Sequence, residues 1–227
     1  MKRPGTIAEV ALEMIRDGQV VGLGSGRAAR SFVEALGARV GQGLKICGVP
    51  TSRETAELAS RCGVPLTTLD EVNAIDVTFD GADEVDPQLD LIKGWGGALV
   101  REKIVAAASK TLVILVGPEK LVDRLGTRGM LPVEVVPFGR TLCRRKISEL
   151  GFASQPRAAG DALFVTDNGN HILDCQVMAL TNPRALEAQL LSIPGVVGTG
   201  LFLGMADTVL VQEEGQVDVR HRLAQHK

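Results

Sequence analysis

The regular alternation of short apolar runs with helix-like segments constrains the fold of this chain more than any other feature. Five runs rich in Val, Ile and Leu are predicted to form strands, at residues 19–24, 44–49, 75–80, 89–93 and 111–117. Apolar residues recur three and four positions apart in four further segments, at residues 6–16, 29–37, 51–63 and 96–110. Continuous apolar strands that alternate with helices are typical of a mostly parallel sheet with helices on both faces. The sequence therefore predicts an α/β fold.

The pattern changes after about Gly126. Strand-like runs and two helix-like segments now follow one another in a different order, at residues 131–136, 138–151, 152–157, 162–167, 171–177 and 182–192. This order predicts a smaller α+β lobe inserted in the α/β domain, and the segment 205–219 is predicted to return to the larger domain as a hairpin. We expect a large catalytic domain of residues 1–126 and 200–227, and a small lobe of residues 127–199.

Composition excludes several classes of partner. The 227 residues are 45% hydrophobic and 23% charged, which is enough apolar material for a substantial core. The net charge is −2 and no stripe of Lys and Arg is interleaved with aromatics, so nucleic acid is not an expected partner. No run approaches the ~18 apolar residues that span a bilayer, and the N-terminus lacks an apolar signal core, so no membrane partner is expected.

The cysteines and histidines do not form a metal-binding pattern. Cys47, Cys62, Cys143 and Cys175 are widely spaced without a CxxC pair, and the chain has only 3 histidines. Neither arrangement favours zinc, so no metal site is predicted. We expect four reduced, buried thiols in a cytoplasmic protein.

The stretch DGADEVDPQLDLIKGWGGALVREK, residues 80–103, gathers six carboxylates around a lysine and a glycine turn. Asp80 and Asp83 follow a predicted strand, where they either face one pocket or cap a turn. Glu84 and Asp86 are expected to be solvated. The stretch is therefore a candidate for proton transfer, with only some of its acids involved.

Lys93 and Glu102 complete this stretch. Lys93 ends an apolar strand, where a cation needs a partner or a ligand. Glu102 lies one turn into the following helix and is either a surface acid paired with a nearby base or a functional group. Carboxylates alone are also Mg²⁺ ligands, but a lysine in the same pocket competes with a cation. Proton transfer beside a fixed positive charge fits the set better.

The turn GSGRAA, residues 24–29, joins the strand at 19–24 to a helix. Free N–H groups and the helix dipole at such a turn favour a phosphate group, although the glycines also suit a tight turn with no ligand. The last glycine of GxGxxG is missing, which argues against a dinucleotide. Ligands of open α/β sheets bind beyond the carboxyl ends of the strands, where we expect this turn, DGAD at 80–83 and KGWGG at 93–97. Thr51 or Ser52 is expected to cap the helix at 51–63.

These motifs together resemble ribose-5-phosphate isomerase of the A type. The similarity is carried by VGLGSG, VPTSRETAELA, DGADEVD, LIKG, REKI, VDRLG, PVEVVPF and TDNGNHILDC, in order from about Ala8 to Val217. It implies an α/β domain with a smaller α+β lobe, and interconversion of ribose 5-phosphate and ribulose 5-phosphate without a metal or organic cofactor. It also implies a small-molecule sugar phosphate as the only ligand and a homo-oligomer, the size of which the sequence does not give.

The resemblance also assigns roles to residues. It implies that Glu102 is the general base, that Asp80 and Asp83 serve ring opening and proton movement between oxygens, and that Lys93 stabilises the enediolate. Backbone N–H groups near Gly94 and Gly96 would assist Lys93. The implied substrate-binding residues are Ser25, Gly26, Arg27, Ala28, Gly81, Ala82, Gly94, Trp95, Gly96 and Lys120.

Several residues depart from the family pattern. Arg27 and Ala28 replace the Ser and Thr of the usual GTGSTA turn, and Trp95 interrupts the glycines after Lys93, where its ring would narrow the pocket or stack on a sugar. Pro4 stands near the place of a common lysine, so Lys2 or Arg3 would have to substitute; GPEK replaces the usual DESK around Lys120. The departures leave the proton-transfer residues intact.

Because two departures touch the phosphate end, an isomerase for a different phosphorylated aldose stays open, as does a non-catalytic sugar-phosphate sensor on a related fold. The chain starts directly with the α/β pattern rather than a DNA-binding segment, and it retains Glu102, so catalysis is favoured over sensing. Coenzyme A transfer on a related fold would need a longer chain or a second subunit and an adenine-binding surface, which the sequence does not indicate.

Overall fold

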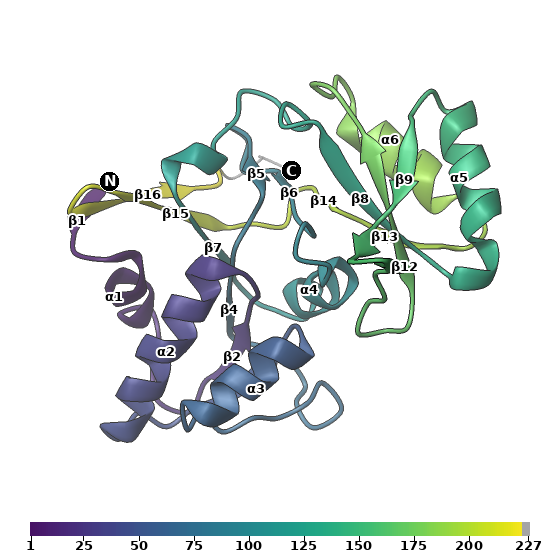
Figure 1. Cartoon of the computed structure of the whole chain (residues 1–227). Helices are drawn as coiled ribbons and strands as arrows, with labels where there is room; N and C mark the ends of the chain where they lie inside the picture. The colour runs from purple at the N-terminus through teal and green to yellow at the C-terminus, as the bar shows by residue number, and fades with distance from the viewer. Residues whose placement is uncertain (224–227) are drawn as a thin grey trace. The chain divides into compact units, whose positions relative to one another are not determined.

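The computed structural model describes residues 1–223, which form two compact units (Figure 1). The first unit comprises residues 1–82, 101–120 and 204–223, and the second comprises residues 83–100 and 121–203. The predicted domain boundaries stay a prediction, and residues 224–227 of the predicted large domain lie outside the described residues. Within residues 1–223, no helix is both long and apolar enough to cross a membrane.

A seven-stranded sheet lies at the centre of the first unit, in the order β1-β16-β15-β7-β4-β2-β3. Its strands are β1 (Lys2–Pro4), β2 (Val20–Leu23), β3 (Cys47–Pro50), β4 (Val77–Asp80), β7 (Leu112–Val116), β15 (Thr208–Glu213) and β16 (Gln216–His221). Neighbouring strands pair in parallel along one part of this order, which comprises β15, β7, β4, β2 and β3. Strands β16 and β1 add an antiparallel edge beside β15. The predicted mostly parallel sheet and its closing hairpin are confirmed; β1 was not predicted.

Helices cover both faces of this sheet, as alternation along β4 illustrates. Phe79 joins one buried cluster with residues of the helices α1 (Ile7–Leu12), α2 (Arg27–Gly41) and α3 (Arg53–Arg61). Its neighbour Thr78 points to the opposite face, where its hydroxyl meets that of Ser109 at 2.6 Å. On that face Val105 of α4 (Leu99–Ala107) packs against Val49 and Ile75. The sheet is therefore buried on both sides, which explains its continuous apolar runs.

Side chains cap the starts of α1 and α3. Thr6 and Glu9 form a capping box at the start of α1, which ends at Leu12, earlier than the predicted 16. Ser52, and not Thr51, caps α3: its hydroxyl accepts a hydrogen bond from the Thr55 N–H at 3.0 Å.

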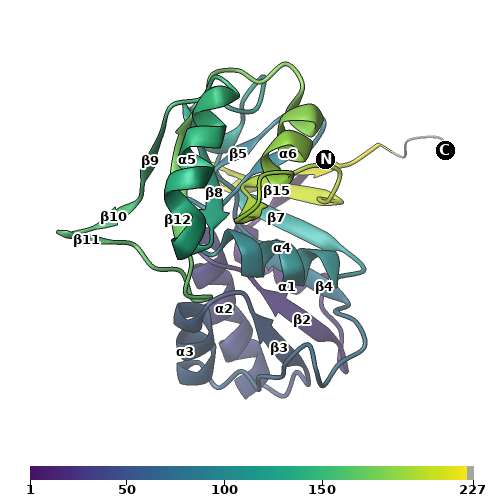
Figure 2. The same ribbon diagram turned by 90° about the vertical axis from the view of Figure 1, so that its right-hand side faces the viewer.

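The second unit contains two antiparallel sheets and a hairpin. The four-stranded sheet has the order β13-β8-β12-β9, and the three-stranded sheet has the order β14-β6-β5. Their strands and helices are β5 (Glu84–Val85), β6 (Leu91–Ile92), β8 (Met130–Val135), α5 (Arg140–Glu149), β9 (Ser154–Pro156), β12 (His171–Gln176), α6 (Pro183–Leu191), β13 (Val196–Thr199) and β14 (Leu201–Phe202). The hairpin β10 (Ala158–Ala159) and β11 (Ala162–Leu163) extends away from α5 and β12 (Figure 2). This unit has its own core around Leu131, Ile147 and Leu173.

One predicted strand belongs to a different sheet from the one expected. The run at 89–93 was predicted to join the parallel sheet, but its core, β6, pairs antiparallel with β5 and β14. Asp86 accepts hydrogen bonds from the N–H groups of Gln88 and Asp90, both at 2.9 Å, and so closes a tight turn between β5 and β6. A connection this short permits only an antiparallel pair. The prediction that KGWGG ends a strand of the parallel sheet is therefore wrong.

The TDNGN segment of the second unit is a turn held by a buried acid. One carboxylate oxygen of Glu134 on β8 accepts hydrogen bonds from Thr166 Oγ1, Asn168 Nδ2 and Asn170 Nδ2, at 3.0, 3.2 and 2.9 Å. These bonds draw the chain into a turn from Thr166 onward, so the predicted strand at 162–167 keeps only Ala162–Leu163. The turn predicted between the strand-like runs at 162–167 and 171–177 is confirmed.

The thiols are free, but only two of the four are buried. Burial raises the pKa of the Cys175 thiol to about 12, and it also raises the pKa of Cys143. Cys62 is half-buried, and Cys47 is exposed because it begins the edge strand β3. The expectation of four buried thiols was therefore wrong for these two.

Candidate active site

In the first unit, Asp80 organises the turn that follows β2. Its Oδ1 accepts the Ser25 N–H at 3.0 Å and the Gly81 N–H at 2.7 Å, and the side chain is buried at the end of β4. A Cβ atom at Gly24 would lie only 2.3 to 2.5 Å from atoms of Asp80, so the close approach requires glycine. Gly26 has φ +85° and begins α2 without a side-chain cap. Asp80 therefore holds the turn, and the turn presents the start of α2.

Glu102 joins this group from α4. Only 5% of the Glu102 residue is exposed, and its Oε1 accepts a hydrogen bond from Ser25 Oγ at 3.0 Å. The interpretation of Glu102 as an ordinary surface acid is wrong. The structure brings Glu102, Ser25 and Asp80 together, as expected for residues beyond the carboxyl ends of parallel strands.

Thr51 belongs to the same group, and sequence reasoning considered it only as a helix cap. Its Oγ1 lies 3.0 Å from Ser25 Oγ and donates to the Leu23 carbonyl oxygen, also at 3.0 Å. Thr51 therefore contacts the same hydroxyl group that donates to Glu102. The signal was available: Thr51 directly follows β3, whose Pro50 pairs with Leu23 of β2.

In the first unit, the rim of the predicted site consists of the implied substrate-binding residues Arg27, Ala28 and Lys120. Arg27 is 91% exposed and its Nη2 lies 3.9 Å from Glu119 Oε1. Glu119 precedes Lys120 in a short 3-10 helix, η1 (Pro118–Lys120), so the Arg27 turn and the Lys120 segment are neighbours. Lys120 and Ala28 are half-buried.

Neither cation near the N-terminus is directed to this rim. Lys2 Nζ forms an ion pair with Glu213 at 2.7 Å, and Arg3 pairs with Glu13. Both side chains therefore form ion pairs near strand β1 and not at the rim.

In the second unit, Lys93 is the central residue. Only 2% of it is exposed, its N–H donates to the Gly200 carbonyl oxygen at 2.8 Å, and its Nζ lies 5.5 Å from the centre of the Phe202 ring. The cation is thus fixed by its backbone and by contact with an aromatic face. A buried, fixed ammonium group of this kind is suited to stabilise a negative charge.

The turn after Lys93 is held by Asp83. The Trp95 N–H donates to Asp83 Oδ2 at 2.9 Å, and the Gly97 N–H donates to the Gly94 carbonyl oxygen at 3.0 Å. Gly94 and Gly97 have φ +99° and +90°, in the left-handed region that favours glycine. Gly96, between them, is exposed, while Gly81 and Ala82, which link Asp80 to Asp83 along the chain, are half-buried. Both aspartates thus bind N–H groups of turns, as the turn-capping alternative predicted.

The Trp95 ring has partners within the second unit. Its Nε1–H donates to the Met130 carbonyl oxygen at 3.3 Å, and the Arg128 guanidinium carbon lies 5.2 Å from the ring centre. These contacts fix the ring on the Arg128 side of the turn. Whether it also stacks on a sugar stays a prediction.

Glu84 was expected to be solvated, and this is wrong. It is fully buried and accepts the Gly126 N–H at 2.5 Å and the Arg128 N–H at 2.7 Å. Burial raises the pKa of this carboxyl group, and the two backbone hydrogen bonds partly oppose that rise. Its partners lie more than 40 residues away, so no local pattern reveals them. Glu84 is a structural acid of the second unit.

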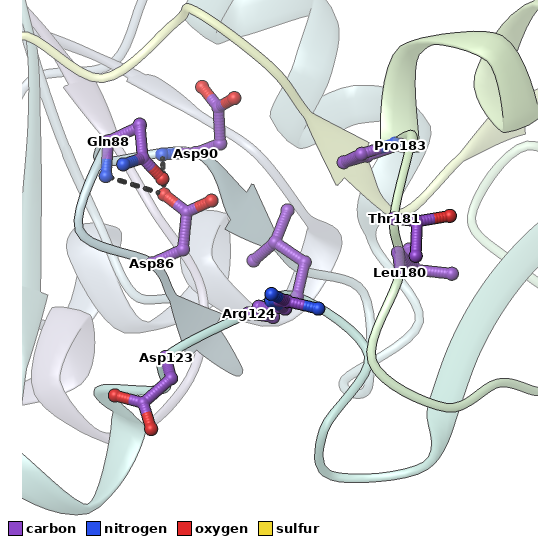
Figure 3. Close-up of a pocket in the computed structure, with 9 residues that line it drawn as sticks. Asp86, Gln88, Asp90, Asp123, Arg124, Leu180, Thr181 and Pro183 are labelled. Carbon is purple, nitrogen blue, oxygen red and sulfur yellow. Dashed lines mark hydrogen bonds between the residues drawn. The ribbon is translucent and has the colours of Figure 1, made fainter.

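Asp86 is half-buried and lines a cavity of about 440 Å³ in the second unit (Figure 3). Figure 3 shows its carboxylate bound to the N–H groups of Gln88 and Asp90. Asp123 and Arg124 also line the cavity, which shares none of its lining residues with the predicted site. The expectation that Asp86 is solvated stays a prediction, because the residue is half-buried and its Oδ1 accepts two backbone hydrogen bonds. Among residues 1–223, no group of three or more His, Cys, Asp and Glu side chains is arranged to hold a metal ion.

Known proteins are similar to this chain in both sequence and fold. The family described as Ribose 5-phosphate isomerase A (phosphoriboisomerase A) matches residues 47–216. Ribose-5-phosphate isomerase A of Gloeobacter violaceus is 50% identical over 215 residues, which cover 94% of each chain.

Two solved structures support the same assignment. Ribose 5-phosphate isomerase A from Methanocaldococcus jannaschii aligns with a TM-score of 0.90 and 40% identity, over 94% of this chain and 96% of that one. A D-ribose-5-phosphate isomerase in complex with phospho-erythronic acid aligns with a TM-score of 0.90 and 40% identity, over 95% and 96%. The similarity covers nearly the whole chain in both sequence and fold. The chain belongs to the ribose 5-phosphate isomerase A family, a family of aldose–ketose isomerases.

Proposed function

We propose that this protein interconverts ribose 5-phosphate and ribulose 5-phosphate through an enediolate, with Glu102 as the general base. The observation that carries the proposal is the environment of Glu102, a buried carboxylate whose Oε1 accepts a hydrogen bond from Ser25 Oγ at 3.0 Å. A carboxylate that is held in place beside a hydroxyl group and shielded from bulk water is suited to move a proton between two adjacent carbons. The family membership of the chain supports the same reaction.

The reaction needs no oxidant, because the oxidation of C2 is balanced by the reduction of C1 in the same sugar. Glu102 takes the proton from C2 of the open-chain aldose, and the C–H electrons form the C1–C2 double bond while the carbonyl electrons pass to O1. Glu102 then returns the proton to C1, and O2 becomes the new carbonyl oxygen as its proton passes to O1. One carboxylate serves both carbons because they are adjacent.

The negative charge on the enediolate requires fixed positive charge. We assign this role to Lys93, which is buried, and to the backbone N–H groups near Gly94 and Gly96. Asp80 and Asp83 serve ring opening and the transfer of the proton between oxygens. Each is held at a turn by N–H donors, and only Gly81 and Ala82 separate them along the chain.

The phosphate end is assigned to the turn at 24–28 and to Lys120. The start of α2 has no side-chain cap, and uncapped N–H groups at a helix start favour a phosphate. Arg27 adds a guanidinium group at a position where the usual turn of the family carries a hydroxyl group. Glu119, the neighbour of Lys120, lies near this guanidinium.

The test is conversion in deuterated water with a chelator present. The wild-type protein is expected to form ribulose 5-phosphate without added metal and to incorporate solvent deuterium at the reacting carbon. Glu102→Gln keeps the shape of the side chain but removes the base, so kcat is expected to fall by about 10²- to 10⁴-fold. The matched control is Glu84→Gln, another buried glutamate of the same stretch, which should retain kcat per folded molecule.

Other outcomes would change the assignment. Binding of ribose 5-phosphate without turnover would favour a sugar-phosphate sensor. Faster turnover of a four- or six-carbon aldose phosphate would keep the chemistry but replace the substrate. Full activity of Glu102→Gln would contradict the assigned base.

A further inference from the structure

Arg157 connects the body of the second unit to the turn after Lys93. The chain reaches Arg157 directly after β9, and its side chain is 12% exposed. Its Nη1 donates to the carbonyl oxygens of both Gly94 and Trp95, each at 2.9 Å, across more than 60 residues of sequence. One nitrogen therefore binds two consecutive peptide groups of the turn.

The other side of the guanidinium group is held by Asp174 of β12. Arg157 Nε and Nη2 donate to the two oxygens of that carboxylate, at 2.9 and 2.5 Å, and the Asp174 side chain is 21% exposed. Four of the five N–H donors of Arg157 are thus engaged. Two parallel bonds to a carboxylate fix the plane of the guanidinium group, so the position of Nη1 is fixed as well.

Peptide geometry carries this constraint to the N–H groups of the turn. The described chain has no cis peptide bonds, and in a trans peptide the C=O and N–H groups point in opposite directions. The Gly94 carbonyl points to Arg157, and the N–H of the same peptide, which belongs to Trp95, accordingly reaches Asp83 at 2.9 Å. The next peptide also directs its carbonyl, that of Trp95, to Arg157, so its N–H, that of Gly96, points away from Arg157.

We propose that Arg157, held by Asp174, is a positioning residue: it keeps the Trp95 N–H on Asp83 and orients the Gly96 N–H toward the reacting oxygens of the substrate. A cation on the carbonyl side also polarises both peptides and makes their N–H groups better donors. This inference rests on the proposed function, because it needs a negative charge that develops beside the turn. Arg157 does not touch the substrate and acts only through the turn.

The test compares Arg157→Met with Arg144→Met. Arg144 is a matched control because its Nε also donates to a backbone carbonyl of the second unit, that of Ser154 at 3.1 Å, but not to the turn. We expect Arg157→Met to lower kcat by about 10- to 100-fold, because misplaced donors lose stabilisation of the transition state. The KM for ribose 5-phosphate should stay within about threefold, because the developing charge is absent in the ground state. Arg144→Met should change neither constant by more than about twofold.

A second readout separates positioning from a general structural role. Phospho-erythronic acid carries a carboxylate whose two oxygens resemble those of an enediolate, so its inhibition constant should rise with the loss of kcat/KM in Arg157→Met. Arg157→Lys keeps the charge but not the fork, and it should recover only part of kcat. Asp174→Asn removes the charge that orients Arg157 and should give a smaller loss of the same kind. If Arg157→Met does not fold, the kcat values of Arg157→Lys and Asp174→Asn test the proposal instead.

The proposal is overturned if Arg157→Met keeps the wild-type kcat, or if KM and the inhibition constant rise together while kcat is unchanged. It is also overturned if Arg144→Met loses as much kcat as Arg157→Met. These outcomes require an active wild-type enzyme. If the wild-type protein does not isomerise ribose 5-phosphate, it is the proposed function that fails.

Discussion

The two glycine turns of this protein look alike in the sequence but are held by different means. Each follows a short apolar strand, β2 or β6, and each precedes a helix, α2 or α4. The turn at 24–27 is held by Asp80, which lies at the end of the adjacent parallel strand β4. The turn at 93–97 is held by Asp83 on one side and by Arg157 on the other.

The difference shows how topology decides which partners a turn finds. A parallel sheet brings its strand ends to one edge, so the partners of the first turn follow from the order of the strands. Thr51, Asp80 and Ser25 meet for this reason. The second turn leaves a small antiparallel sheet, and the arginine that holds it comes from a different sheet of the second unit. Its geometry therefore depends on a long-range partner, Arg157, as well as on nearby Asp83.

Among changes that distinguish the two turns, the largest effect is expected when the second turn loses its cation. Lys93→Met keeps most of the aliphatic length but removes the positive charge, so kcat should fall by about 10²- to 10³-fold. Steady-state kinetics with ribose 5-phosphate measures this. Lys110→Met is the control, because Lys110 is 67% exposed and pairs with Asp76 at 2.8 Å on the surface, and its loss should leave kcat unchanged. A Lys93→Met enzyme with more than about a tenth of the wild-type kcat would place the essential charge elsewhere.

A smaller effect, on stability rather than kcat, is expected at the base of the second turn. Glu84 pairs with Ile92 in the β5–β6 register, next to Lys93, and accepts two backbone N–H groups. Glu84→Gln places an amide where these donors need acceptors, so the free energy of unfolding should fall by about 1–3 kcal/mol. Denaturant unfolding measures the loss. An unchanged midpoint would mean that the two hydrogen bonds do not support the unit.

The same variant should change the dependence of stability on pH. Burial raises the pKa of folded Glu84 above its ordinary 4.5, so the folded state binds this proton more tightly than the unfolded state. The stabilisation from this difference is complete below 4.5 and is lost as the pH rises through the folded pKa. The difference in stability between the wild type and Glu84→Gln isolates this contribution. The difference in unfolding free energy should therefore favour the wild type more at a pH near 4.5 than at a pH above the folded pKa of Glu84.

The smallest effect is expected at the first turn. Arg27 is 91% exposed, so a bond from it to phosphate is screened by solvent. Arg27→Ser restores the hydroxyl that is usual in the family and should raise the KM for ribose 5-phosphate by about threefold, with kcat unchanged. The increase should disappear at high ionic strength, where the charge is screened. A change in kcat, or an equal KM at low salt, would remove Arg27 from the phosphate site.

Much of the fold was predictable because its signals are local. The apolar runs of β2, β3, β4 and β7 alternate with helices, and the parallel sheet follows from that order. The β6 strand was assigned to the wrong sheet because two residues of strand carry too little pattern to reveal their partner. Asp86, five residues earlier, was the unused signal, because its side chain closes the turn that makes the pair antiparallel.

The sequence by itself determined the α/β architecture, the family, and the segments in which acids, lysine and glycines are concentrated. These features depend on periodicity and on short motifs, which are properties of neighbouring residues. Only the tertiary structure decided what each buried acid does. Glu84 and Glu102 lie in one stretch, yet one binds the backbone of a distant loop and the other binds the hydroxyl of Ser25. The same holds for Arg157, whose importance lies in two carbonyls more than 60 residues away. The donors that surround a buried charge come from distant parts of the chain, and only folding brings them together.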